Sequence, residues 1–278
     1  MLNKFFKCIF IFISVCTAAI QATAQSQASE NLFKIYNPLQ FHGILRYDHY
    51  LSSGSFFYLE NNVQSAVRPL YGLTFPANTH LNRTVLGYEH AFTENWYGGV
   101  SGRYELSPFE NFMIGRVNLS HRGKIKSLYF IKELALEHQH TQPQNGRSYP
   151  AIGRLSFSAA LIKAFKIKED RHLFVMASFR PTRNFFYTFP NDVFRIRRIN
   201  SSDLRLDLAY NVTNNLYLGI FALRNTFYSY RLGMTDGAGN PIVEEGRVNR
   251  VSPTVGFTVN YVFKPVGVKF ILPNLPVR

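Results

Sequence analysis

The sequence predicts an all-β protein, a closed antiparallel transmembrane β-barrel of about ten strands, within a range of eight to twelve. Apolar and polar residues alternate along nearly the whole chain after residue 40. The alternating segments are about 9–13 residues long, close to the roughly 9–11 that a tilted membrane-spanning strand needs and longer than usual globular strands. The connections between them alternate between short and long. Each of these features is typical of a barrel wall.

The alternation is clearest near the end of the chain, in residues 253–263. One face of this segment carries only apolar residues: Val255, Phe257, Val259, Tyr261 and Phe263. The opposite face carries Thr254, Gly256, Thr258 and Asn260. The same criterion predicts strands at residues 41–50, 83–92, 96–106, 112–120, 126–138, 152–165, 172–182, 203–211, 216–228 and 250–263.

The predicted connections fall into two sets that alternate along the chain. The short set comprises residues 93–95, 121–125, 166–171 and 212–215. The other set comprises residues 51–82, 139–151, 183–202 and 229–249, with 107–111 as its short member. Membrane barrels have short periplasmic turns and longer extracellular loops. An even strand count then places both ends in the periplasm. A soluble periplasmic β-sandwich that binds a ligand is the alternative, but nothing in that fold requires such alternation.

The first residues predict export. Lys4 and Lys7 precede an apolar run at residues 8–16, and small residues lead to Ala24, so a signal peptide is expected with cleavage between Ala24 and Gln25. The expected organisation is a signal peptide at 1–24, a periplasmic N-terminal segment at 25–39 and the barrel at 40–263. Residues 264–278 form a C-terminal tail or an additional strand. Both cysteines lie in the removed segment, which leaves no disulfide or thiolate metal site.

The charge of the chain indicates its surroundings. Loss of Lys4 and Lys7 lowers the formal net charge from +14 to +12. Such a basic protein in the bacterial envelope is expected to contact anionic outer-membrane lipid and lipopolysaccharide. Nucleic acid is not expected as a partner, because export separates the chain from it and no basic recognition helix is present.

With these features the chain resembles the small bacterial outer-membrane β-barrel proteins. The resemblance rests on the signal peptide through Ala24, the alternating strands and the closing stretch 259–263, and it covers most of residues 40–263. It implies an outer-membrane location and folding by the barrel-assembly machinery, with Tyr261 and Phe263 as the assembly signal. Residues 264–278 follow that signal. The oligomeric state stays open.

Turning the polar face of each strand inward predicts a charged lumen. The residues predicted to face the lumen are Arg46, Asp48, Arg83, Glu89, Arg103, Glu105, Arg116, Glu133, Arg154, Arg180, Asp203, Arg205 and Asp207, together with Glu137. A barrel of this size is nearly filled by its own side chains, and buried charges must be paired. We therefore expect a salt-bridged, largely plugged lumen. A narrow pathway for small polar solutes past the arginines is the alternative.

Two groups of residues near the predicted rim could form a functional site or could be ordinary solvated polar residues. Arg195, Arg197 and Arg198 could contact anionic lipid or form a solvated basic rim. Glu133 and Glu137 lie near His138 and His140, as in acid–base or metal sites, although ordinary polar rim residues also fit.

The expected function is therefore a non-enzymatic barrel with a structural, binding or narrow-transport role, without catalytic residues, cofactor or metal. The alternative is a barrel enzyme that acts on lipid, lipopolysaccharide or peptide at the extracellular rim.

Overall fold

The computed structural model describes residues 32–51, 55–66, 79–107, 110–143, 151–185, 199–231, 234–238, 241–243 and 246–264. The chain forms two units. Residues 1–33 and 231–247 make up the first, in which β12 (Met234–Thr235) pairs antiparallel with β13 (Pro241–Val243). Residues 34–230 and 248–278 make up the second, which carries the barrel. Within the described ranges, no helix is long and apolar enough to cross a membrane.

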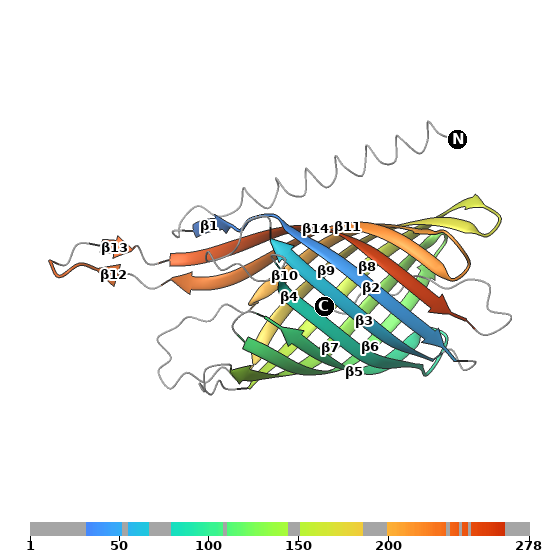
Figure 1. Ribbon diagram of the computed structural model, residues 1–278, viewed down its shortest axis with the longest axis horizontal. Helices are drawn as coiled ribbons and strands as arrows, with labels where there is room; N and C mark the ends of the chain where they lie inside the picture. Colours follow the sequence, from blue (N-terminus) through green and yellow to red (C-terminus); the bar gives the residue numbers. More distant parts are fainter. Residues whose placement is uncertain are drawn as a thin grey trace. The chain divides into compact units, whose positions relative to one another are not determined.

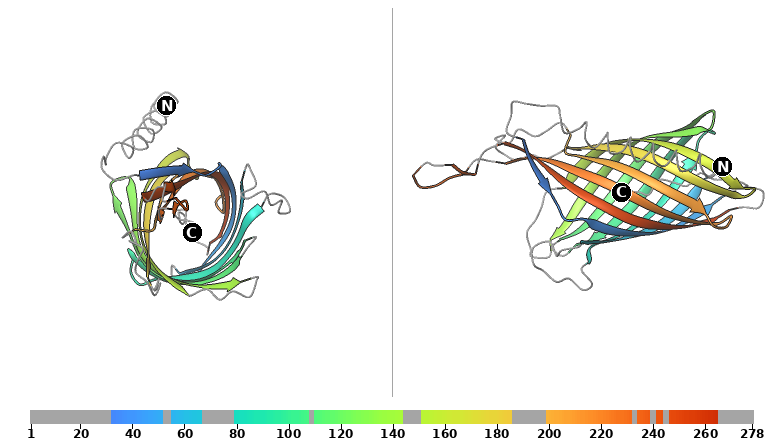
Figure 2. Two further views of the ribbon diagram at one scale, coloured as in Figure 1. Left: turned by 90° about the vertical axis from the view of Figure 1, so that its left-hand side faces the viewer. Right: turned by 90° about the horizontal axis from the view of Figure 1, so that it is seen from above.

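The barrel has eleven strands (Figure 1). They are β2 (Gln40–Tyr50), β3 (Phe56–Ala66), β4 (Thr79–Ala91), β5 (Trp96–Leu106), β6 (Glu110–Ile125), β7 (Leu128–Pro143), β8 (Ile152–Lys168), β9 (Arg171–Phe185), β10 (Ser201–Asn211), β11 (Leu216–Arg231) and β14 (Gly246–Phe263). Consecutive strands from β2 to β11 pair antiparallel. β14 lies beside β11 and pairs with β2, so the strands form a closed ring (Figure 2). β1 (Leu32–Tyr36) extends the sheet beside β14.

The all-β barrel of about ten strands is confirmed, and the sandwich alternative is wrong because one sheet closes on itself. The additional strand is β3, which lies within the connection expected at residues 51–82. Phe56 and Tyr58 are buried, and Phe57 and Leu59 are exposed, so the start of β3 is apolar on both faces. Period-two alternation is lost there, which explains why the pattern did not reveal this strand.

The closing pair is parallel, with Thr254 opposite Gln40 and Phe263 opposite His49. β2 therefore begins, and β14 ends, at opposite ends of the barrel, in contrast to the arrangement expected from an even strand count. Glycine permits close packing at this seam. A Cβ on Gly256 would lie 2.5 Å from the backbone carbonyl oxygen of His42, and the Gly43 Cα faces the ring of Phe257.

One end of the barrel carries the short connections, and we call it the short-turn end. They are residues 51–55, 92–95, 126–127, 169–170 and 212–215. At the opposite, long-loop end, β3, β5, β7, β9 and β11 finish and β4, β6, β8, β10 and β14 start, and all of these pairs except β5 and β6 are separated by longer stretches of sequence. The turn expected at 121–125 lies instead at Lys126 and Ser127, because β6 and β7 pair as far as Ile125 and Leu128. Lys126 has the positive φ, 54°, that such two-residue turns use.

The wall of the barrel buries polar side chains inside and exposes apolar side chains outside, the reverse of a soluble protein. On β2, Arg46 and Asp48 are buried, whereas Leu45 and Tyr47 are exposed. The same alternation exposes large apolar side chains on the outside of other strands: Leu59, Leu86, Val100, Val117, Leu136, Phe157, Phe179, Ile220 and Phe257. An apolar exterior around a polar interior is the distribution of a barrel in lipid.

Candidate functional site in the barrel lumen

The structure turns all of the predicted lumen charges toward the interior, on β2 and on β4 through β10. It adds Glu60 on β3 and Arg122 on β6. Away from the strand ends, eight arginines and eight carboxylates thus face the lumen and are buried or half-buried. They are Arg46, Arg83, Arg103, Arg116, Arg122, Arg154, Arg180 and Arg205, with Asp48, Glu60, Glu89, Glu105, Glu133, Glu137, Asp203 and Asp207.

Arg46 holds the most deeply buried pair of carboxylates. Its Nε donates to Asp48 Oδ1 at 2.8 Å, and its Nη1 donates to Glu60 Oε2 at 3.1 Å. The side chains of Arg46 and Glu60 are 1% and 0% exposed. Asn260 from β14 donates to the other Asp48 oxygen at 3.0 Å, and the Arg46 guanidinium lies 4.5 Å from the centre of the Tyr58 ring. This group joins β2, β3 and β14 across the closing seam.

A second group, which we call the arginine cluster, lies on β4 through β9. Its members are Arg83, Arg103, Arg116, Arg154 and Arg180 with Glu105, Glu133 and Glu137. Two of the carboxylates are shared. Glu105 accepts from Arg83 at 2.6 Å and lies 2.9 Å from Arg103 Nε. Glu137 accepts from Arg180 at 2.9 Å and from Arg103 at 3.5 Å.

Two further arginines, Arg205 and Arg122, each pair with a carboxylate. Arg205 Nε donates to Asp207 Oδ1 at 2.7 Å along the same strand, and its guanidinium lies 3.8 Å from the centre of the Phe221 ring. Arg122 from β6 is paired with Glu89 from β4, and it lies 3.9 Å from the centre of the Tyr97 ring. Aromatic faces thus cover the guanidinium groups that the carboxylates leave open.

Glu60 and Arg122 were not predicted, because each lay in an expected connection. A sequence signal existed for Glu60, since an unstructured connection as long as residues 51–82 is uncommon in a compact fold. Arg122 gave no such signal. The turn that follows it contains neither glycine nor asparagine, the usual indicators of a two-residue hairpin.

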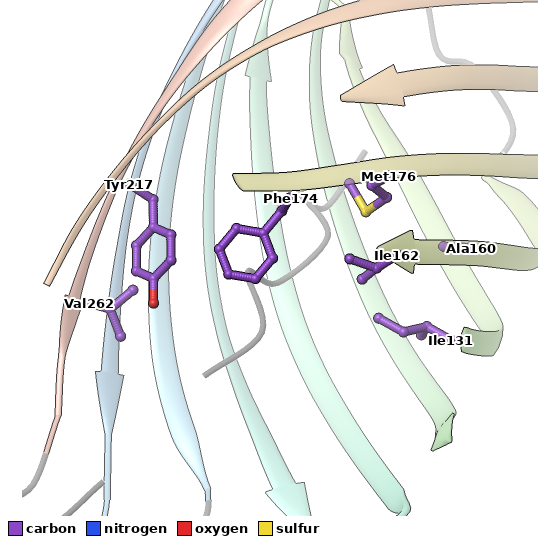
Figure 3. Close-up of a cluster of buried hydrophobic side chains, with 7 residues drawn as sticks. All are labelled: Ile131, Ala160, Ile162, Phe174, Met176, Tyr217 and Val262. Carbon is purple, nitrogen blue, oxygen red and sulfur yellow. The ribbon is translucent and has the colours of Figure 1, made fainter. Parts of the chain in front are cut away.

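An apolar layer lines the lumen toward the short-turn end (Figure 3). Its buried members are Ile131, Ala160, Ile162, Phe174, Met176, Tyr217 and Val262, from β7, β8, β9, β11 and β14. The cluster follows the inner face of the wall from β7 to β14, through the strands that lie between them in the ring. A neighbouring cluster of Phe56, Tyr58 and Val85 packs on Tyr50, which also contacts the layer.

The remaining predicted residues lie elsewhere. His138 and His140 are exposed on the outer face, whereas Glu133 and Glu137 point inward, so strand geometry separates the histidines from the carboxylates. Tyr261 and Phe263 also face outward, where their rings stack on those of Tyr47 and His49. Across the described ranges, no three His, Cys, Asp or Glu side chains converge as metal ligands. Ala24, Gln25, Arg195, Arg197 and Arg198 lie outside the described residues, as does the tail after Lys264.

A closed sheet with an apolar exterior and a charged interior defines the class of this protein, the outer-membrane β-barrel fold. No protein family matches the sequence, and no curated protein is significantly similar to it. Among solved structures, the NanC porin is 13% identical, with 78% of this chain and 90% of that chain covered and a TM-score of 0.41. LpxR from Salmonella typhimurium is 9% identical, with 78% and 87% covered and a TM-score of 0.42. Neither likeness bears on the residues of the lumen.

Proposed function

We propose that this chain is a non-enzymatic outer-membrane barrel whose lumen is closed at the short-turn end, so that it binds or holds molecules and does not conduct them. The observation that carries the proposal is the apolar layer of Ile131, Ile162, Phe174, Tyr217 and Val262, whose side chains are buried inside the barrel. The outer-membrane location is part of the proposal. The belt of exposed apolar side chains supports it, because such a belt is stable only against lipid.

The layer opposes transport of polar solutes for a physical reason. Phe174 and Ile162 are 2% and 0% exposed, so the layer leaves these side chains little contact with water. A polar solute that enters an apolar layer loses its hydrogen bonds to water without replacement, which costs several kcal/mol per group.

The ion pairs that Arg46 forms in the lumen also oppose transport of polar solutes. Arg46, Glu60 and Asp48 are held together with almost no exposure, and separating one partner would leave an uncompensated buried charge. That penalty is about 3–5 kcal/mol in proteins. Thermal motion therefore seldom opens a polar path beside the layer, and a structural or binding role fits better than rapid transport.

Conductance in planar lipid bilayers tests this proposal. Wild-type protein is expected to give no steady channel current, whereas Phe174→Ala combined with Met176→Ala should introduce one by removing side chains that fill the lumen. Phe179→Ala is the matched control, because Phe179 lies on the same strand but is 49% exposed on the outer face. It should remain silent. Steady, large currents from the wild type would overturn the proposal and support a solute pathway.

A further inference from the structure

We propose that the arginine cluster is a binding site for a small anion that carries a carboxylate or a phosphate group and enters from the long-loop end. The inference deepens the proposed function, since a lumen closed at one end is open to ligands only from the other. It rests on three independent observations: the charge of this half of the lumen, the state of Arg154 and the position of the cluster along the strands.

The lumen charges balance as a whole but not locally. β4 through β9 form one contiguous part of the ring and, away from the strand ends, contribute six arginines and four carboxylates, a net charge of +2. The remaining strands contribute Arg46 and Arg205 with Asp48, Glu60, Asp203 and Asp207, a net charge of −2. Within the arginine cluster itself, five arginines share three carboxylates. Repulsion among these arginines favours an additional negative charge there.

Arg154 identifies the place where that charge would bind. It shares the inward face of β8 with the buried Ser156 and Ser158. Among the described residues, none forms a hydrogen bond or ion pair with the Arg154 guanidinium. Glu137, its register partner on β7, and Glu105 attract it electrostatically, but both are already engaged by Arg180, Arg103 and Arg83. A half-buried guanidinium with free donors is suited to bidentate binding of a carboxylate or phosphate.

The cluster lies near the rim from which a ligand would enter. Arg154 is the third residue of β8, which starts at the long-loop end, and Glu105 is the next-to-last residue of β5, which finishes there. The side chains of Arg83 and Arg180 are 17% and 12% exposed, against 1% for Arg46. Anions can therefore reach these guanidinium groups, whereas Arg46 is fully enclosed by its own carboxylates.

Calorimetric titration of the full-length protein in non-ionic detergent tests the site, with inorganic phosphate and acetate as probes at constant ionic strength in chloride. The wild type should bind at least one probe saturably, and comparison of the two identifies the preferred group. Arg154→Gln should weaken binding by about tenfold or more, the usual effect of losing hydrogen bonds to a charged group. Arg183→Gln is the matched control, because Arg183 lies on β9 but is exposed on the outer face. It should leave affinity within about twofold.

A second variant is expected to change phosphate affinity in the opposite direction. Glu137→Gln removes a carboxylate that competes for Arg103 and Arg180, so phosphate affinity should increase. Absence of saturable binding by the wild type, or equal weakening by Arg154→Gln and Arg183→Gln, would overturn the site. Its failure is distinguishable from that of the closed lumen. A silent barrel that binds no anion refutes only the site, and a conducting barrel that binds anions at Arg154 refutes only the closure.

Discussion

Phe174 on β9 and Tyr217 on β11 face each other inside the barrel with ring centroids 6.0 Å apart, although β10 separates the two strands in the sheet. Their contact exists only because the wall curves and the side chains point to a common interior. Ile131, Ile162 and Val262 complete the same layer (Figure 3). The barrel is thus packed at this end like the core of a soluble domain, while its outer face is apolar as well.

This packing predicts a large stability difference between two phenylalanines on one strand. Phe174→Ala should lower the free energy of unfolding by about 3–5 kcal/mol, because it leaves a cavity among buried neighbours. Phe179→Ala removes a ring that is already 49% exposed, and its effect should be less than half as large. Urea titration of the protein folded in lipid vesicles measures both. Equal losses would contradict a packed interior.

The pair formed by Arg205 and Asp207 predicts non-additive substitutions. Asp207→Leu alone leaves the 2%-exposed Arg205 side chain without its carboxylate, and should cost about 3–5 kcal/mol. The double substitution Arg205→Met with Asp207→Leu removes both charges and should cost markedly less than the single change. A double-mutant cycle in urea measures the coupling. A coupling energy near zero would show that the two side chains do not depend on one another.

The apolar exterior predicts a depth-dependent penalty for charge. Leu136 lies near the middle of β7, is 52% exposed and is flanked on the neighbouring strands by Val117 and Leu155. Leu136→Arg should destabilise the folded state in vesicles by about 2–4 kcal/mol, as expected at the bilayer midplane. Ile242→Arg serves as control, because Ile242 is 65% exposed on β13, which pairs with β12 in a separate two-stranded sheet. Tolerance of arginine at residue 136 would indicate that this face meets water.

The parallel seam predicts a specific crosslink. Leu45 and Val259 are register partners on β2 and β14, and adjacent strands lie about 4.8 Å apart, within the range that a disulfide spans. Leu45→Cys with Val259→Cys should therefore crosslink on mild oxidation, seen as a mobility change that a reductant reverses. Leu45→Cys with Val255→Cys, four residues out of register, should not. If only the second pair crosslinked, the register of closure would be wrong.

The barrel class was predictable because its determinants are local. Alternating residues give the strand, and its length gives the span, so β5, β10 and β14 were located within a few residues. β3 was missed because Phe56, Phe57, Tyr58 and Leu59 make both of its faces apolar at the start. The inner face of that stretch packs on Tyr50 and Val85, which only the closed barrel brings near.

For the lumen charges, too, one property was predictable from the sequence and another was not. Which charges point inward follows from strand parity, and the structure places the predicted set there. Their partners do not follow from parity. Glu137 on β7 binds Arg103 on β5 and Arg180 on β9, neither of which lies on a neighbouring strand. Such contacts depend on the diameter and tilt of the closed barrel, and the strand pattern specifies neither of them.

The most direct test of the account is the behaviour of the full chain in bacterial membranes and on gels. Expressed with its N-terminal segment, the protein should appear in the outer-membrane fraction and migrate differently in SDS before and after boiling. A barrel whose backbone groups are all paired in a closed sheet resists detergent until heated. A protein found in the soluble periplasmic fraction, with the same mobility in both samples, would contradict the membrane barrel and with it the closed lumen.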